Sequence, residues 1–297
     1  MLIACLGGAH LDTKAHLGDV PRLAGSNPAT ITRSPGGVAC NVARNLVRLG
    51  AHVVICSLVG DDDAAASLRA TLTAEGVDDS GLVTDPALPT AGYFAVLDPT
   101  GGLVIGVTDM AIYEAIDVAW VDDAVRRATG ADLWVVDANL PEPVLRLLID
   151  RAPVPVLADP VSVPKAERLN PVLNGLTWVF PDRAEAAVLA DGFPADHIAN
   201  AARISSGGAG VVVSLGAEGA YQHGGNGNEA RPAIAPDRVT DVTGAGDALV
   251  AGFAYALAAG ESDPLGWGLA AASLAIETGS SAPEHLSADA IRLRLEI

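Results

Sequence analysis

Residues 241–247 read DVTGAGD and lead directly into an apolar segment of helical character, Ala248–Ala259. Gly244 and Gly246 allow positive φ angles and close approach of a ligand. Free N–H groups at a helix start attract an anion, and the first helical turn would favour the ionised form of Asp247. An anion-binding turn beside a carboxylate is what phosphoryl transfer to an alcohol requires. An ordinary capped turn has a similar composition, so the rest of the chain must decide between the two.

Composition excludes several classes of protein. The 297 residues are 50% hydrophobic, which is ample for one large domain with or without an appendage. The formal charge of −18 argues against nucleic acid as a partner, because phosphate backbones require clustered Lys and Arg. Three cysteines lack metal-ligand spacing and are expected to be reduced core residues. With neither a signal peptide nor a membrane span in the sequence, we expect a soluble cytoplasmic protein.

Short β-branched runs alternate with Ala- and Leu-rich helical segments. This pattern is typical of a parallel sheet covered by helices on both faces, that is, an α/β fold. The expected strands are Leu2–Leu6, Val53–Leu58, Leu133–Asp137, Val154–Ala158, Trp178–Val179 and Gly210–Ser214. The expected helices are Asn41–Leu49, Ala64–Glu75, Asp117–Ala128, Pro143–Arg151, Arg183–Leu189, His197–Ser205, Asp247–Ala259 and Pro264–Glu277.

Two segments interrupt this alternation. Asp12–Pro35 is polar and rich in turn residues, and Ala91–Val107 has the pattern of a hairpin with its turn at Asp98–Gly102. Antiparallel strands inserted into a parallel core predict a small separate sheet, which beside a site can act as a lid. Gly224–Asn228 is a further expected hairpin tip.

A second glycine-rich motif, GGVACNVA at residues 36–43, precedes a helix. Its paired glycines would let the backbone approach a ligand, and Asn41 could either cap the helix or bind a ligand hydroxyl. A plain glycine turn with an Asn cap remains the alternative. Gly7–His10 lacks the GxGxxG spacing, which argues against a dinucleotide-binding dehydrogenase.

The two motifs, in this order and in a chain of this length, resemble the ribokinase (PfkB) family of carbohydrate and nucleoside kinases. The resemblance covers nearly the whole chain. It implies a ribokinase-like α/β/α sandwich with a mainly parallel central sheet and a small β-sheet lid. Residues 1–297 would form one kinase domain, with lid insertions at about 12–35 and 91–112. ATP and Mg²⁺ are the implied cofactors, with K⁺ as an optional further ion.

The resemblance also implies roles for individual residues. Asp247 would be the base that accepts the proton of the acceptor hydroxyl, and the N–H groups of Gly244, Ala245 and Gly246 would hold the transferred phosphoryl group. In the sugar pocket, Asp12 would bind vicinal hydroxyls. The remaining pocket residues would be Gly36, Gly37 and Asn41.

For the nucleotide, the implied ATP-binding residues are Ser214, Gly216, Gly219 and Thr243. The family's N-x-x-E motif, which organises Mg²⁺ through water, matches Asp182 to Glu185, with Asp182 in place of the usual Asn. Carboxylates suit Mg²⁺, so metal binding is expected to survive this change, and Asp159 would join the same acidic shell.

The acceptor is indicated by Asn27, Thr108, Asp109 and Asn139, whose surroundings resemble those of pseudouridine kinases. Such an enzyme would convert pseudouridine to pseudouridine 5′-phosphate, with the base under the lid. Asp109, supported by Thr108, would accept a hydrogen bond from the extra ring N–H of this nucleoside. Thr108 and Ala111 depart from the subfamily pattern, which leaves another nucleoside open.

Two further alternatives are a kinase for a free sugar such as ribose or fructose and a non-catalytic, ligand-binding family member. The intact Asp247 and its glycine turn argue against the second. An exposed lid sheet often pairs with a copy of itself, so we expect a homodimer formed through the lid.

Overall fold

The structure, a computed structural model, describes residues 1–192, 196–225 and 227–296. Its centre is a nine-stranded sheet in the order β13-β12-β11-β10-β9-β8-β1-β4-β5. The strands from β5 to β11 run parallel, and β12 and β13 add an antiparallel edge. Their bounds are β1 Leu2–Leu6, β4 His52–Gly60, β5 Asp78–Asp85, β8 Leu133–Asp137, β9 Val156–Asp159, β10 Trp178–Val179, β11 Gly210–Ser214, β12 Ala220–His223 and β13 Glu229–Arg231.

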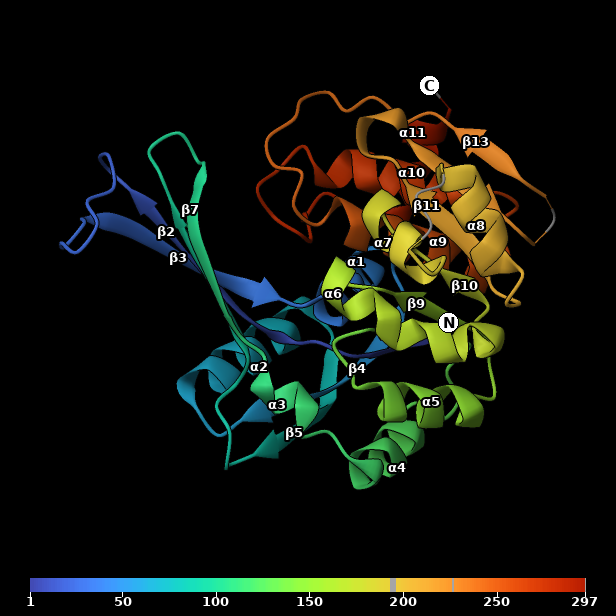
Figure 1. Cartoon of the computed structure of the whole chain (residues 1–297), viewed down its shortest axis with the longest axis horizontal. Helices are drawn as coiled ribbons and strands as arrows, with labels where there is room; N and C mark the ends of the chain where they lie inside the picture. The colour runs from blue at the N-terminus through green and yellow to red at the C-terminus, as the bar shows by residue number, and fades with distance from the viewer. Residues whose placement is uncertain (193–195, 226, 297) are drawn as a thin grey trace.

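Helices cover both faces of this sheet, because its strands are apolar on both sides (Figure 1). Along β1, Ile3 and Cys5 enter one core, while Ala4 and Leu6 enter the other. One layer consists of α1 Val38–Arg48, α2 Asp63–Glu75 and α9 Ala245–Ala259, with α10 Pro264–Ala275 and α11 Ala288–Leu295 packed on α9. The other consists of α3 Ala111–Glu114, α4 Val118–Arg127, α5 Glu142–Arg151, α6 Val163–Ala166, η1 Glu167–Gly175, α7 Arg183–Leu189 and α8 His197–Ser205. The predicted α/β/α sandwich is confirmed.

A separate four-stranded sheet, called the small sheet below, projects from this body (Figure 1). Its order is β3-β2-β6-β7, with bounds β2 His10–Leu17, β3 Ala29–Gly36, β6 Gly92–Leu97 and β7 Leu103–Asp109. The hairpin predicted at 91–107 is confirmed as β6 and β7, and Asp98 N donates to Gly102 O at its turn. The segment 12–35 was expected to be turn-rich, yet two regular strands occupy most of it. Polar residues are tolerated in these strands because most of them are exposed to solvent or only partly buried.

Some edge strands had no clear sequence signal. The polar segment that forms β5 pairs with β4 at the edge of the large sheet, and β12 pairs with β13 at the other edge. The hairpin expected at 224–228 fits this second pair, although Asn226 lies outside the described residues. Among the described helices, none has the length and apolar character needed to cross a membrane.

The strand order reverses between β1 and β8. From β1 the chain builds outward to β4 and β5, and then returns to place β8 on the other side of β1. In open α/β sheets, ligands bind outside the carboxyl ends of the strands at such a switch point. Residues that follow β1 and β8 are therefore the first place to look for a site.

Candidate active site

Asp137, at the end of β8, joins three segments at the switch point. Its side chain is fully buried and accepts hydrogen bonds from the backbone N–H groups of Gly8 (2.9 Å), Ala39 (2.8 Å) and Asn139 (2.9 Å). Burial raises the pKa of Asp137, and these three bonds oppose that rise. Asp137 therefore fixes the loop after β1 against the start of α1.

Asp247 lies in the first turn of α9, which begins after Gly244 in the left-handed conformation (φ 82°). A Cβ atom on Gly244 would lie 2.8 Å from Ser281 Cα, so only glycine fits there. Asn41 Nδ2 donates a hydrogen bond of 2.8 Å to Asp247 Oδ2. Burial raises the pKa of Asp247 to about 7 against the opposing Asn41 bond, and the charges of Asp137 and Asp12 raise it further. A carboxylate with this pKa is suited to accept a proton near neutral pH.

The turn before Asp247 has the geometry of an anion-binding site. Thr243 N donates to Asp241 Oδ1 (2.9 Å), which shapes the turn. Gly246 is exposed, and no atom lies within 4 Å of the position a Cβ would take. The helix start therefore presents open space at Gly246, while the Ala245 N–H donates to Val242 O (3.3 Å) within the turn.

The second motif lies against the same carboxylate. A Cβ on Gly36 would lie 2.4 Å from the Asp12 carboxylate, and one on Gly37 would lie 2.3 Å from Gly8 O. Gly37, with φ 95° and backbone atoms of Gly8 against it, is thus required, whereas the space beside Gly36 is taken by the Asp12 carboxylate. Asp12 Oδ1 and Asn41 Oδ1 are buried, and neither receives a hydrogen bond of good geometry from the described residues. Asn41 Oδ1 can therefore accept a ligand hydroxyl, whereas Asp12 Oδ1 has His10 Nε2 at 3.2 Å.

The register of the small sheet decides which of its side chains share a face. Ser34, Asp12, Tyr93 and Thr108 stand opposite one another across β3, β2, β6 and β7. Side chains alternate along a strand, so Asp109 belongs to the opposite face, and its Oδ1 accepts from Ala111 N (3.2 Å). Thr108 therefore lies with Asp12, and Asp109 does not.

Both lysines of the chain reach this region. Lys14, two residues after Asp12 and on the same face of β2, places Nζ 3.7 Å from Asp241 Oδ2. Lys165, in α6, places Nζ 2.5 Å from Asn139 Oδ1, and burial lowers the pKa of Lys165. Asn139 itself is buried against Gly8, so it supports the loop after β1.

Asn27 lies apart from these residues. It belongs to the connection between β2 and β3, and its amide is used in that turn. Its Oδ1 accepts from Arg22 N (2.8 Å), and its Nδ2 donates to Arg22 O and Gly25 O. Figure 1 shows this connection at the far tip of the small sheet.

The residues of the predicted acidic shell follow two neighbouring strands: Asp159 ends β9, and Asp182 and Glu185 come after β10. Burial raises the pKa of Asp159 well above its usual range, and the charges of Asp247 and Glu185 add to this effect. Burial likewise raises the pKa of Glu185. Asp182 and Glu185 form a capping box at the start of α7, in which Asp182 Oδ1 accepts from Glu185 N and Glu185 Oε2 accepts from Asp182 N. An Asp at position 182 is therefore explained as a helix cap.

Within the described ranges, no three His, Cys, Asp or Glu side chains cluster tightly enough to hold a metal ion directly. Asp159 and Glu185 nevertheless fit Mg²⁺, which prefers oxygen ligands and usually keeps several waters. Two acids whose pKa values are raised by burial and like charge favour a nearby cation. The residues therefore fit a water-mediated Mg²⁺ site.

Three of the four predicted ATP-binding residues lie at or just after the end of β11, namely Ser214, Gly216 and Gly219. The fourth, Thr243, lies in the turn before α9. Ser214 ends the strand, and its N–H donates to Pro181 O (2.9 Å). Gly216 is exposed with φ 61° and has no atom within 4 Å of a hypothetical Cβ. Gly219 is required for another reason, because its Cβ would lie 2.0 Å from Arg231 O in β13.

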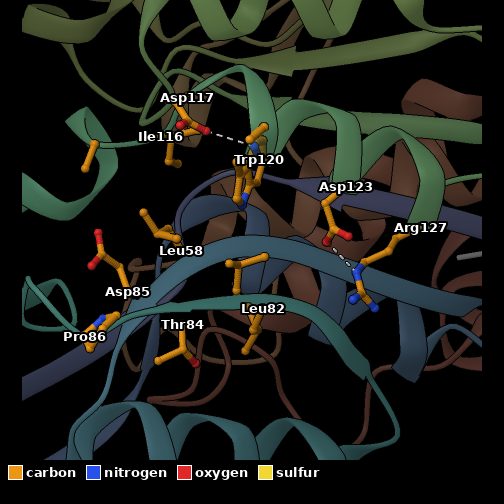
Figure 2. Close-up of a pocket in the computed structure, with 13 residues that line it drawn as sticks. Leu58, Leu82, Thr84, Asp85, Pro86, Ile116, Asp117, Trp120, Asp123 and Arg127 are labelled. Carbon is orange, nitrogen blue, oxygen red and sulfur yellow. Dashed lines mark hydrogen bonds and ion pairs between the residues drawn. The ribbon is translucent and has the colours of Figure 1, made fainter.

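A groove of about 550 Å³ lies elsewhere, between the edge strand β5 and α4 (Figure 2). Leu82, Trp120 and the Asp123–Arg127 pair line it. It contains none of the predicted site residues.

Sequence reasoning missed four residues of the site: His10, Lys14, Tyr93 and Tyr113. Period-2 alternation in residues 10–17 and 92–97 could have placed Lys14 and Tyr93 with Asp12 and Thr108. The contact of His10 with Tyr113 joins residues 103 positions apart and has no local signal.

Comparisons with known proteins identify the family of this chain. The profile described as pfkB family carbohydrate kinase matches residues 3–286. A pseudouridine kinase of Escherichia coli is 32% identical over 258 residues, which cover 85% of this chain and 82% of that protein. A carbohydrate kinase structure from Agrobacterium tumefaciens superposes with a TM-score of 0.85 at 30% identity, covering 99% of this chain and 97% of that one. Arabidopsis thaliana ribokinase, solved with ribose and ATP, shares the fold with a TM-score of 0.84 at 21% identity, covering 100% and 98%. The chain therefore belongs to the pfkB family of carbohydrate kinases and is a phosphotransferase with an alcohol acceptor.

Proposed function

We propose that this kinase transfers the γ-phosphoryl group of ATP to the 5′-hydroxyl of a nucleoside, and that pseudouridine is its acceptor. The observation that carries the proposal is the juxtaposition of Asp247, Asn41 and Asp12. It supplies a base, a buried amide oxygen of Asn41 without a hydrogen bond among the described residues, and the carboxylate of Asp12. The similarity to the E. coli pseudouridine kinase supports the choice of nucleoside.

In the proposed reaction, the Asp247 carboxylate accepts the proton of the 5′-hydroxyl as the oxygen attacks phosphorus. Asn41 holds that carboxylate through its 2.8 Å hydrogen bond. The N–H groups of Gly244 to Gly246 stabilise the charge on the transferred phosphoryl oxygens. Positioning and charge stabilisation supply most of the catalysis in phosphoryl transfer.

The sugar would bind between the second motif and the small sheet. Asp12 accepts hydrogen bonds from vicinal hydroxyls, and Asn41 Oδ1 accepts from a further hydroxyl. A buried acceptor left unpaired is costly, so these oxygens penalise an acceptor that lacks the hydroxyls.

The base would lie under the face of the small sheet that carries Tyr93 and Thr108. Tyr93 offers an aromatic surface, and the Thr108 hydroxyl can accept the extra ring N–H of pseudouridine. The sequence favours Asp109 as the acceptor for this N–H group. We propose Thr108 in its stead, because the strand register puts Thr108 on the same face as Asp12.

ATP would lie beyond Asp247, over the turn at Ser214 and Gly216, and close to Thr243. When bound through water by Asp159 and Glu185, Mg²⁺ would neutralise phosphate charge. Support for Mg²⁺ comes from the acidic surroundings of these two residues. A K⁺ requirement stays a proposal that rests on the family resemblance alone.

We infer that the small sheet acts as a lid and joins two copies of the chain. Its outer face exposes Ile31, Phe94, Ile105 and Val107, which are 53–61% exposed. The register places them opposite or beside one another across the strands. An apolar sheet face of this kind marks an interaction surface, and a second copy offers the matching face.

The test is a coupled assay of ADP release with ATP·Mg²⁺ over pseudouridine, uridine, adenosine, cytidine, ribose and fructose. The expected result is the highest kcat/KM on pseudouridine. Turnover of ribose without turnover of pseudouridine would refute the nucleoside proposal and favour a sugar kinase. Absence of turnover on every acceptor would favour a ligand-binding role.

A further inference from the structure

A buried row of polar groups leads from the base of the small sheet to Asp12. His10 Nε2 lies 3.2 Å from Asp12 Oδ1, and His10 Nδ1 lies 3.1 Å from the Tyr113 hydroxyl. His10 is 7% exposed and Tyr113 is 1% exposed. His10 is the first residue of β2, and Tyr113 lies in α3, shortly after β7. The row therefore joins two of the four connections between the body and the small sheet.

The two partners of His10 determine which of its nitrogens carries a proton. The Asp12 carboxylate can only accept a hydrogen bond, so the hydrogen of a neutral ring belongs on Nε2, which lies 3.2 Å from Asp12 Oδ1. His10 Nδ1 is then the acceptor, and the Tyr113 hydroxyl donates to it. A neutral imidazole that accepts at Nδ1 carries its hydrogen on Nε2, the atom that faces Asp12.

We propose that His10 is a positioning residue that orients the Asp12 carboxylate toward the vicinal hydroxyls of the acceptor, and that Tyr113 fixes the tautomer on which this depends. The inference rests on the proposed function, because it assumes a ribosyl acceptor. Asp12 Oδ1 is buried and has no well-aligned hydrogen bond among the described residues, so His10 is the group that can restrain it. Contacts of this kind in an active site tighten when substrate binds.

The position of His10 explains how one side chain can contact both Tyr113 and Asp12. Its ring spans the space between a phenol from α3 and a carboxylate from β2, and each nitrogen has one partner. A site is precise only when the residues that support its ligand contacts are themselves fixed. Tyr113 is fixed by burial, so the restraint passes from the body to Asp12.

Two conservative variants separate the two contacts of His10. In His10→Asn, the shorter amide can replace Nδ1 and keep the contact with Tyr113, but it loses the donor toward Asp12. In His10→Gln, the longer amide can replace Nε2 and keep that donor. Thermal unfolding of both variants checks that the fold is retained.

The first measurement compares kcat and KM for pseudouridine and 2′-deoxypseudouridine, or for whichever ribosyl acceptor the wild type uses and its 2′-deoxy counterpart. For His10→Asn we expect kcat/KM on the ribosyl acceptor to fall about tenfold, mainly through KM, with little change on the 2′-deoxy acceptor. His10→Gln should retain most of the discrimination. An equal loss on both acceptors, or no loss on either, would overturn the proposal.

The second measurement needs no substrate. Nitrogen-15 NMR of the six histidine rings, with the His10 signal identified by its absence in His10→Asn, reports the tautomer directly. We expect the Nε2–H form in the wild type and a mixture in Tyr113→Phe. An Nδ1–H or doubly protonated ring in the wild type would overturn the proposal. If no acceptor is phosphorylated, the proposed function fails while this result still decides the role of the row.

Discussion

The two sheets of this molecule differ in what their faces contact. The nine-stranded sheet is covered by helices on both faces, and the ends of its strands hold Asp137, Asp159 and the loops around Asp247. The small sheet has one polar face toward the site and one exposed apolar face. A rigid, fully packed body suits the groups that must hold the reacting atoms, whereas a projecting sheet suits recognition and closure. The predictions below test this division, from the largest expected effect to the smallest.

Asp247→Asn should affect the chemical step most. Loss of the base should lower kcat on the order of 10²–10⁴-fold with little change in KM, because the amide keeps the shape but cannot take the proton. Steady-state kinetics measure this. Asp289→Asn, at an exposed carboxylate of α11, is the matched control and should be neutral. A near-normal kcat would remove Asp247 from the role of base.

Asp12→Asn should weaken recognition in the small sheet. We expect kcat/KM to fall about 10–100-fold, since a charged hydrogen-bond acceptor is lost. Asp247 must be ionised to act, so activity of the wild type should fall as the pH drops through about 7. Asp12 is one of the charges that raise the pKa of Asp247. In the variant, the fall of kcat/KM on the acidic side of the pH profile should therefore occur at lower pH. An unmoved limb in the pH profile of kcat/KM would contradict this coupling.

Phe94→Asp combined with Ile105→Asp should separate the two copies. Charges on the outer face of the small sheet prevent its burial, so light scattering coupled to gel filtration should show a monomer, with activity reduced only a few-fold. Leu293→Asp, at an exposed apolar residue of α11, is the control. A wild type that is monomeric at every concentration would disprove pairing through the small sheet.

Lys14→Met should loosen the contact between the small sheet and the catalytic turn. The Lys14–Asp241 pair is partly exposed, so the expected loss in kcat/KM is only about two- to fivefold and should shrink in high salt. Lys14→Arg should retain most of the activity. A large loss in both variants would instead indicate that Lys14 contacts a substrate.

The smallest effect concerns stability. The pKa of Asp247 is about 7 in the fold and 3.8 as its ordinary value, so between these limits the folded state binds more protons than the unfolded chain. Stability is therefore lost as the pH rises from about 4 to 7. Asp247→Asn should raise Tm by a few degrees at pH 8 and leave it nearly unchanged at pH 4. An equal change at both pH values would contradict this linkage.

Several features could be predicted from sequence because they depend on local chemistry. The alternation of apolar runs predicted the covered parallel sheet, and DVTGAGD predicted a glycine turn at the start of α9. Strands β2 and β3 of the small sheet were harder to predict, because they are polar on the face toward the site and lack the apolar pattern of a buried strand. The expected roles of Asn27 and Asp109 could not be checked from sequence either, since strand register and side-chain direction decide them.

By itself, the sequence determined the fold class, the family and the two motifs, because backbone freedom, helix starts and hydrophobic periodicity act over a few residues. Only the tertiary structure decided which groups meet. Asn41 and Asp247 are 206 positions apart, and His10 and Tyr113 are 103 positions apart. Their contacts depend on the strand order that places β1 beside β8 and on the register of the small sheet. Long-range packing therefore decides that the DVTGAGD turn lies against Asn41 of the second motif and Lys14 of the small sheet.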